Sequence, residues 1–409
     1  MQKGYLIVNV YHDDETKPLE NANVKIIGEN YSQSFTTNTN GKTEKITLEA
    51  PDKKYSLYPQ YEIKPYATYD LTVTKSGFNT VTIKNVEVFA DEIGLENVYL
   101  KQKPGSTENI NLPEHDLWTG HNQDQSSGED YSFKPQEQDE VSSRIMPSVI
   151  IPEFIRVKNG TPTSNAAVLT VPFKDYIKNV ASSEIFPTWH RQALIANVNA
   201  IVSFTLNRVF TEWYPSRGFN FTISASPAFD QAFVNNRTIF QSISDVVDEF
   251  FRDYIRLNNT THPFFAQYND GRQTNIPGRL SQWGSQEMAT RGSTAIQILR
   301  HFYTPNLTVL AGHEVVGLPS SFPGYNLRVG SCGNPVRDLQ TRLNRIRANF
   351  PAIPTISPVD GRFGDNTRRS VEAFQRAFNM PVTGVVDIAT WLRISNIFTA
   401  VAGLQHGVR

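Results

Sequence analysis

Two helical patterns near the centre of this 409-residue chain constrain its fold more than any other feature. From Tyr176 onward, apolar and small side chains recur at the 3.6-residue spacing of an α-helix, and Glu184 follows on the same face. Pro187 ends that helix. Residues 191–212 then carry apolar side chains on nearly every face, which is typical of a buried helix. We therefore expect a helical core, with Glu184 at a helix end among apolar neighbours.

Glu184 is the candidate catalytic residue. A carboxyl group among apolar neighbours has a raised pKa, so it can hold a proton near neutral pH and act as a general acid. The residues alone leave a second interpretation open, in which Glu184 faces solvent or pairs with His190 or Arg191.

The composition argues against several functional classes. Hydrophobic residues make up 39% of the chain, and the formal net charge is −1, so we expect a globular protein that binds neither nucleic acid nor an anionic membrane surface. The single cysteine, Cys332, excludes an intrachain disulfide framework and a multi-cysteine zinc site. We expect no membrane span, because no run of about 18 apolar residues occurs. Residues 1–15 also lack the apolar segment of a standard secretory signal peptide.

Residues 1–102 predict an all-β sandwich. Segments of alternating apolar and polar residues cover 5–11, 23–27, 32–37, 45–48, 69–74 and 80–83. Turn signals such as Ser76-Gly77 separate them. The features KPLENANVKI, TNTNGKTEKI and YDLTVTKSGFNTVTIKNVEV resemble transthyretin-like modules. No histidine cluster or Gly-rich phosphate loop occurs here, so we expect a non-catalytic module.

Residues 103–150 predict a flexible linker. Pro, Ser, Gln, Glu, Asp and Gly dominate this segment, and apolar residues are few. We expect its two histidines, His115 and His121, to be solvated and inert. A long exposed linker is also the preferred place for a protease to cut.

Residues 151–325 predict a mixed α+β domain. Beyond the two opening helices, the spacing predicts a third helix over 239–255 and a fourth over 285–303. Ser281, Gln282 and Trp283 precede the fourth helix, and such residues suit sugar recognition, because amides bond hydroxyls and an indole stacks on a pyranose ring. Ser281 is equally a candidate helix cap, and Trp283 a candidate core residue.

Residues 326–400 carry a third pattern, VGSCGNPVRDLQTRLN, VDGRFGDNTRRSVEAFQRAF and TGVVDIATW. Six apolar side chains in it have the spacing of a helical core: Val336, Leu339, Leu343, Val371, Phe374 and Trp391. The pattern resembles the small three-helix peptidoglycan-binding module. The resemblance implies a wall polymer as ligand.

The central segments YIKNVASSEI, FAQYNDGRQT and SQWGSQEMATRG resemble the stage II sporulation protein D family of peptidoglycan lytic transglycosylases. The resemblance implies that Glu184 is the catalytic acid. It further implies a substrate-binding role for Tyr268, Ser281, Gln282 and Trp283. From near residue 3 to near residue 400, the chain resembles spore cortex-lytic enzymes of the SleC type.

Three departures from the family pattern affect these expectations. Some relatives hold zinc with Cys and His residues around residues 269–280, but the sequence here is NDGRQTNIPGRL, so we expect no metal and no cofactor. Val202 stands where the family often has an Arg in the second helix, and SQWG replaces SQYG.

The resemblance implies cleavage of the β-1,4 bond between MurNAc and GlcNAc to give 1,6-anhydromuramic ends. It also implies a proenzyme that a serine protease activates in the linker, located in the spore cortex or coat region and acting in germination. Two alternatives stay open. One is a hydrolytic muramidase with Asp230 or Asp270 as second carboxylate, and the other is a wall-binding structural or regulatory protein whose catalytic cleft has decayed. The sequence leaves open cortex or vegetative wall as substrate, the cleavage site and the oligomeric state.

Overall fold

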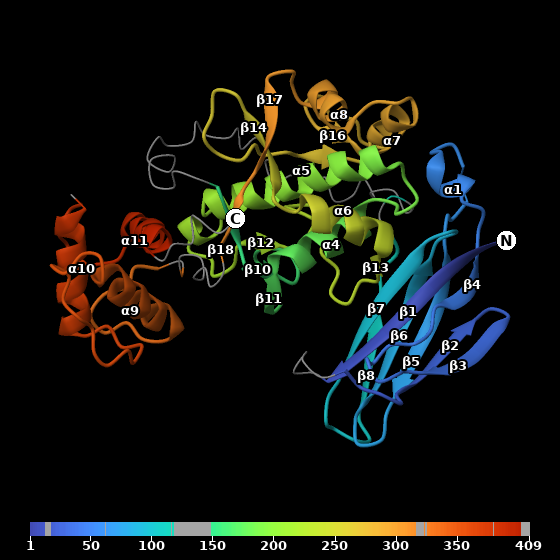
Figure 1. Cartoon of the computed structure of the whole chain (residues 1–409), viewed down its shortest axis with the longest axis horizontal. Helices are drawn as coiled ribbons and strands as arrows, with labels where there is room; N and C mark the ends of the chain where they lie inside the picture. Colours follow the sequence, from blue (N-terminus) through green and yellow to red (C-terminus); the bar gives the residue numbers. More distant parts are fainter. Residues whose placement is uncertain are drawn as a thin grey trace.

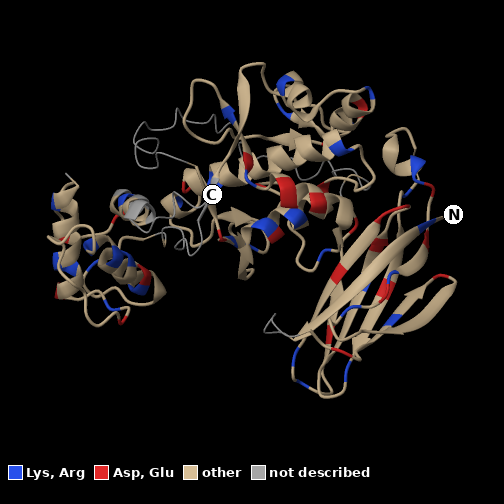
Figure 2. Ribbon diagram, viewed as in Figure 1, with Lys and Arg blue, Asp and Glu red and all other residues tan. Residues whose placement is uncertain are grey.

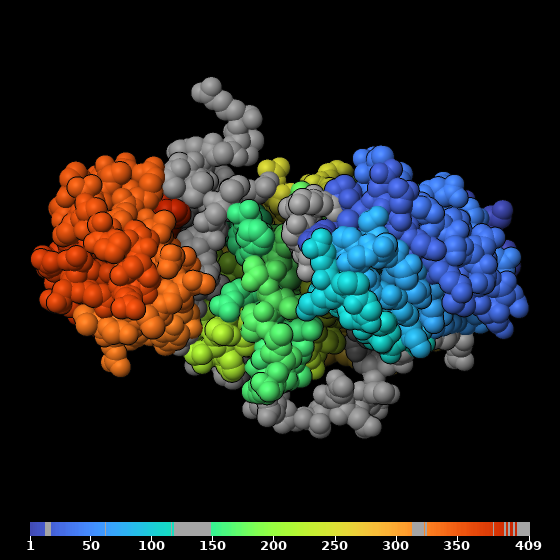
Figure 3. Space-filling view, turned by 90° about the horizontal axis from the view of Figure 1, so that it is seen from below, coloured from blue at the N-terminus to red at the C-terminus, as the bar shows by residue number. Residues whose placement is uncertain are grey.

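The computed structural model describes residues 1–12, 18–61, 63–115, 117, 149–315, 323, 325–378 and 380–401. A central domain lies between an N-terminal β-sandwich and a group of C-terminal helices (Figures 1 and 3). Charged residues of both signs are spread along the chain in all three parts (Figure 2).

Two sheets form the N-terminal sandwich. The first has the order β13(Ile239–Phe240)-β7(Ile93–Leu100)-β1(Gln2–His12)-β4(Ile46–Ala50). The second has the order β3(Tyr31–Thr36)-β2(Asn23–Gly28)-β5(Ala67–Thr74)-β6(Thr80–Val88)-β8(Thr107–Asn111). Buried and exposed residues alternate along β2 and β4, so one face of each sheet packs against the other. The predicted all-β character of this region is confirmed.

The sandwich extends past its predicted end at residue 102. Strand β8 pairs in parallel with β6, and Leu112 and His115 beyond it are buried. The sequence of β8, TENIN, has one apolar residue and lies at a sheet edge, so alternation could not reveal it. His115 is therefore not a solvated linker residue as predicted. His121 and most of the predicted linker lie outside the described residues.

A strand of the central domain completes the first sheet of the sandwich. β13 pairs antiparallel with β7, with Ile239 opposite Leu95 and Phe240 opposite Gly94. The predicted helix over 239–255 is therefore wrong at both ends. The helix is α6 (Gln241–Phe250), and it is followed by strand β14 (Asp253–Leu257), which pairs with β17 (Leu307–Ala311). Strand pairing with distant segments overrides the local helical spacing at both ends.

Two helices form the centre of the central domain, as predicted. They are α4 (Phe173–Glu184) and α5 (Arg191–Phe210), and α5 is buried along almost its whole length. Among the described residues, α5 is long and apolar enough to cross a membrane, but the core helix of a globular protein meets the same criteria, and α5 is 94% buried. The predicted fourth helix is two helices, α7 (Gln282–Thr290) and α8 (Ala295–Phe302), because Gly292 adopts a left-handed φ of 94° and Thr294 caps α8.

In the described residues outside the C-terminal module, further short elements accompany these, together with the 3-10 helix η2 (Pro215–Arg217). They are α1 (Lys54–Leu57), β9 (Ile150–Pro152), β10 (Phe154–Lys158), β11 (Val168–Pro172), β12 (Ile223–Ser224), β15 (Tyr268–Asn269), β16 (Leu280–Ser281) and β18 (His313–Val315).

The C-terminal module has the three predicted helices, α9 (Asn334–Arg347), α10 (Asp365–Ala377) and α11 (Ile388–Val401). All six predicted core residues are buried. The same pattern of hydrogen bonds from a glutamine side chain to the main chain stabilises two of its loops. The side chain of Gln340 accepts from the Gly361 N–H and donates to the Arg362 carbonyl, and Gln375 bonds Gly384 and Val385 in the same way.

Candidate active site

Glu184 is the last residue of α4 and is turned into the protein, with 6% of its surface exposed. Its Oε1 accepts a hydrogen bond of 2.6 Å from the main-chain N–H of Ala232. The two residues that offered an alternative partner are engaged elsewhere. Arg191 bonds Glu249, and the ring of His190 accepts from the Gln192 N–H. The structure therefore excludes the interpretation in which Glu184 faces solvent.

Gln231, next to Ala232, is tied into the same core. Its Oε1 accepts from the hydroxyls of Tyr176 at 3.0 Å and Thr205 at 2.8 Å, and its Nε2 donates to the Ile201 carbonyl. The loop that contacts Glu184 is thus bonded to both α4 and α5. Sequence reasoning missed the contact of this loop with Glu184, because a main-chain donor such as the Ala232 N–H leaves no signal in the side-chain pattern.

Tyr268 lies beside Glu184. It is on β15, which runs parallel to β16 and brings the FAQYND and SQWG segments together. Burial raises the pKa of the Tyr268 hydroxyl well above its usual value, and the charge of Glu184 raises it further. Tyr268 therefore remains a neutral hydroxyl, able to donate a hydrogen bond next to the carboxyl group.

The other three predicted substrate-binding residues lie on the β16–α7 segment. Gln282 donates from Nε2 to the main-chain carbonyl of Glu184 at 3.1 Å. Ser281 caps α7 by accepting from the Gly284 N–H. Trp283 packs against Phe186 and Trp189, with ring centroids 5.8 and 5.1 Å away. The cap and core roles foreseen for Ser281 and Trp283 are confirmed, and of the three side chains Gln282 is the one bonded to Glu184.

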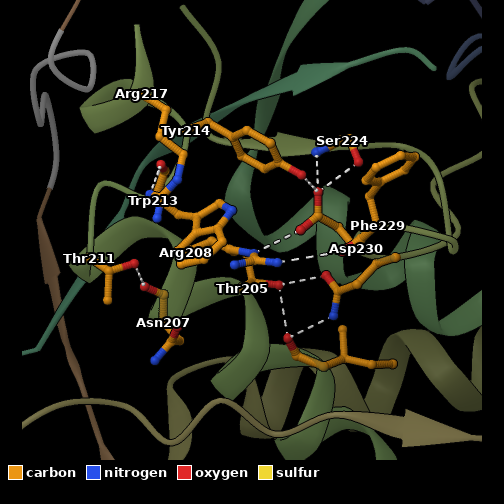
Figure 4. A network of polar contacts seen from close by, with 12 residues as sticks. Thr205, Asn207, Arg208, Thr211, Trp213, Tyr214, Arg217, Ser224, Phe229 and Asp230 are labelled. Atoms are coloured by element: carbon orange, nitrogen blue, oxygen red, sulfur yellow. Dashed lines mark hydrogen bonds and ion pairs between the residues drawn. The ribbon is translucent and has the colours of Figure 1, made fainter. Parts of the chain in front are cut away.

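Asp230, a candidate second carboxylate, is bonded on both oxygens (Figure 4). Its Oδ1 accepts from Nε of Arg208 at 2.8 Å. Its Oδ2 accepts from the Tyr214 hydroxyl and from both the N–H and hydroxyl of Ser224. Both Arg208 and Asp230 are buried. These bonds hold the loop that leads to Ala232, and they occupy the acceptor positions that a catalytic base needs.

Asp270 and Asn269 form the turn after Tyr268. The carboxylate of Asp270 accepts from the N–H groups of Gln273 and Thr274, so it fixes the turn. The side-chain amide of Asn269 is buried and has no hydrogen-bond partner among the described residues.

Among the described residues, no group of three or more His, Cys, Asp or Glu side chains could hold a metal ion. Cys332 is exposed. The position of the family Arg, Val202, is fully buried in α5.

Comparison with known proteins identifies one region of the chain. Residues 332–394 match the family model described as a putative peptidoglycan binding domain. A zinc D-Ala-D-Ala carboxypeptidase from Streptomyces albus G is 32% identical over 91 residues, which are 22% of this chain and 34% of that protein. The chain thus spans about a third of the length of this curated relative.

Two solved structures are similar to parts of the chain. The N-terminal domain of SleB is 28% identical and is matched over 93% of its length and 18% of this chain, at a TM-score of 0.16. A 5-hydroxyisourate hydrolase from Klebsiella pneumoniae is 16% identical over 91% of its length and 24% of this chain, also at 0.16. At TM-scores this low, neither likeness bears on the fold of the whole chain.

The chain is therefore a multidomain protein with a sheet-rich N-terminal region and a helical C-terminal region that contains a peptidoglycan-binding domain. The match indicates peptidoglycan binding and a function related to the cell wall.

Proposed function

We propose that this protein is a peptidoglycan lytic transglycosylase in which Glu184 is the single catalytic carboxyl group. The observation that carries the proposal is the burial of Glu184, with Oε1 held by the Ala232 N–H and the Tyr268 hydroxyl alongside. A buried and oriented carboxyl group next to a neutral donor is suited to general acid catalysis. The peptidoglycan-binding domain would hold the glycan strand near this site.

The proposed reaction uses Glu184 twice. As an acid, it donates its proton to the glycosidic oxygen, and the bond from that oxygen to C1 of the muramic acid breaks. As a carboxylate, it then accepts the proton of the C6 hydroxyl while the C6 oxygen bonds C1. The 1,6-anhydro ring closes, water is not consumed, and Glu184 ends protonated as it began.

The hydrolytic alternative needs a second carboxylate. The bonds of Asp230 to Arg208, Tyr214 and Ser224, and those of Asp270 to its own turn, favour the transglycosylase over the muramidase. The alternative of a wall-binding protein without activity gains its support from Val202 at the family Arg position and from the burial of Trp283 in an aromatic cluster.

The substrate class and biological setting are part of the proposal. We infer spore cortex as substrate, a germination role in the cortex or coat region, and activation by a serine protease that cuts between residues 104 and 150. The residues around such a cut, 118–148, lie outside the described part of the chain. Strand β8 is paired within the sandwich, which restricts the expected cut to the segment after it.

Product analysis tests the proposal. Purified cortex peptidoglycan is digested with the full chain before and after a single cut in the linker, and the fragments are identified by mass spectrometry. We expect anhydro-muropeptides, released faster by the cut protein. Reducing muramic acid ends would indicate a muramidase, and an absence of fragments with both preparations would indicate a binding protein. Equal rates before and after the cut would contradict activation by proteolysis.

A further inference from the structure

We propose that the Arg208–Asp230 ion pair and Gln231 are positioning residues, which hold the Ala232 N–H against Glu184 and thereby set which oxygen of its carboxyl group carries the proton. This inference rests on the proposed function, because it assigns a role within the same site.

Three consecutive residues of one loop make separate contacts that together position the Ala232 N–H against Glu184. Asp230 fixes the start of the loop through its buried ion pair with Arg208 on α5 (Figure 4). Gln231 bonds the hydroxyls of α4 and α5, as described above. Ala232 follows directly and reaches Glu184 at 2.6 Å. The loop therefore cannot shift at Ala232 without breaking bonds at the two residues before it.

The far side of the loop is clamped as well. The side chain of Asn179 on α4 donates to the Val234 carbonyl and accepts from the Val234 N–H, at 2.8 and 2.9 Å. Asn179 and Glu184 belong to the same helix, so the loop and the catalytic carboxyl group share one rigid support. This arrangement fixes the donor relative to the carboxyl group far more tightly than an exposed loop would.

The direction of the hydrogen bond has a chemical consequence. A main-chain N–H can only donate, so Oε1 must accept, and the proton of the acid form belongs on Oε2. Donation to a carboxylate also favours its ionised form, which offsets the effect of burial. The loop thus leaves Oε2 as the oxygen that carries the proton and eases the change of Glu184 from acid to base within one reaction.

A change in another charged or titratable group around this carboxyl group would also change its pKa. Tyr176 and Tyr268 sense the charge of Glu184. Arg208 and Asp230 approach from α5 and from the loop, and Arg237 bonds the adjacent Ser183. The test variants below leave both tyrosines and Arg237 unchanged.

The principal variant is Asp230→Asn. The side-chain oxygen of the new asparagine can still accept from Arg208. Its NH2 group, however, replaces Oδ2 and faces two other donors, the Ser224 N–H and the Tyr214 hydroxyl, so the loop should move away from Glu184. Loss of the donated bond raises the pKa of Glu184, but loss of the Asp230 charge beside Arg208 lowers it, so the shift of the high-pH limb of kcat/KM is read from a variant that removes no charge. Misplacement of the carboxyl group should lower kcat/KM roughly 10- to 100-fold.

The matched control is Asp248→Asn, the same substitution in an exposed ion pair between α6 and Lys178 of α4. It should leave the pH profile unchanged. The variant that removes no charge is Thr205→Val, which removes one hydroxyl from Gln231 and should move the high-pH limb of kcat/KM up by less than about one unit. Thr205→Ser keeps the hydroxyl and should restore the wild-type profile. This pair decides the question even where Asp230→Asn does not fold.

A direct titration separates the two proposals. The carboxyl band of Glu184 is followed by infrared difference spectroscopy of the full chain against its Glu184→Gln variant, at a series of pH values and without substrate. A higher midpoint in Thr205→Val supports the positioning role. A folded Thr205→Val variant with the wild-type midpoint overturns it. If the wild-type chain releases no fragments from peptidoglycan, the proposed function fails, and this titration still decides whether the loop controls Glu184.

Discussion

The two modules that flank the central domain are joined to it in different ways. The sandwich shares a hydrophobic core with the central domain, because Tyr66 and Phe89 pack within the central cluster and Phe89 contacts Phe186 and Phe240. The core of the C-terminal module is formed by residues 327–394 alone. Across that second boundary, the carboxylate of Glu212 in the central domain interacts electrostatically with the guanidinium of Arg342 and raises its pKa, against the larger effect of burial, which lowers it.

Buried polar contacts also join the sandwich to the central domain. Arg237 of the central domain bonds Glu87 of the sandwich at 2.9 Å, and the ring of His115 contacts the other oxygen of Glu87 at 3.2 Å. Burial alone would raise the pKa of Glu87, but the charge of Arg237 and the hydrogen bond from His115 outweigh it and lower that pKa. Trp189 also donates to the main-chain carbonyl of Ser56 in α1. The sandwich and the central domain thus form one folding unit, whereas the C-terminal module has the core of an independent one.

The largest expected effect comes from deletion of the sandwich. Residues 149–323 expressed alone should not fold, because Phe186 and Phe240 would be exposed and Arg237 would lose its carboxylate partner. Circular dichroism and thermal unfolding measure this. The full chain, cut in the linker after folding, should keep both fragments together on size exclusion. A soluble and cooperatively unfolding 149–323 fragment would show that the sandwich is a removable shield.

The C-terminal module should behave in the opposite way. Residues 326–409 expressed alone should unfold cooperatively and pellet with insoluble peptidoglycan, because the core of the module and its Gln340 and Gln375 bonds lie within that fragment. The sandwich, residues 1–112, should stay in the supernatant. If the sandwich pelleted and the C-terminal fragment did not, wall binding would belong to the N-terminal end of the chain, which would contradict this assignment.

Arg237→Met tests the buried interface at a single position. The variant leaves Glu87 buried without its main charged partner, and the free energy of unfolding should fall by about 3–5 kcal/mol. The control Lys64→Met breaks the exposed ion pair with Glu114 and should cost under about 1 kcal/mol. Urea denaturation compares them. Equal losses in the two variants would mean that the buried pair contributes no more than a surface one.

Glu96 provides a smaller effect that depends on pH. Burial raises its pKa from 4.5 to about 8, although a hydrogen bond from Thr238 of the central domain lowers it in part. The folded state then holds a proton that the unfolded state releases, so the free energy of unfolding should fall as pH rises from about 4.5 to about 8. The loss should be on the order of a few kcal/mol.

Glu96→Gln should remove most of this pH dependence. Glu92, whose pKa burial raises to about 7, should leave a smaller slope of the same sign. Urea denaturation at several pH values measures both. A wild-type slope in the variant would contradict a protonated Glu96 in the interface.

The sequence predicted local features of this fold well and long-range ones poorly. Helices α4 and α5 follow from their own spacing, and Glu184 could be found because it continues the apolar face of α4. Strand β13 could not be found, because its two residues become a strand only by pairing with β7. The burial of His115 likewise depends on Glu87 and Phe186, far away in sequence.

The same division holds within the candidate site. Tyr268 and Gln282 were predicted from their segments and lie against Glu184. The role of Asp230 was open, because the sequence alone does not show that Arg208 lies opposite it. Such pairs are properties of the packed structure, and the residues that hold a catalytic group are therefore harder to predict than the group itself.

The substitution Glu184→Gln in the full chain is the most direct test of the central claim, which is that Glu184 performs the chemistry. Glutamine keeps the size of the side chain and the acceptor for the Ala232 N–H but cannot exchange a proton. After the linker cut, release of anhydro-muropeptides should fall by roughly 10² to 10⁴-fold, while the thermal unfolding midpoint stays near that of the wild type. A folded variant with activity within a few-fold of the wild type would contradict the account.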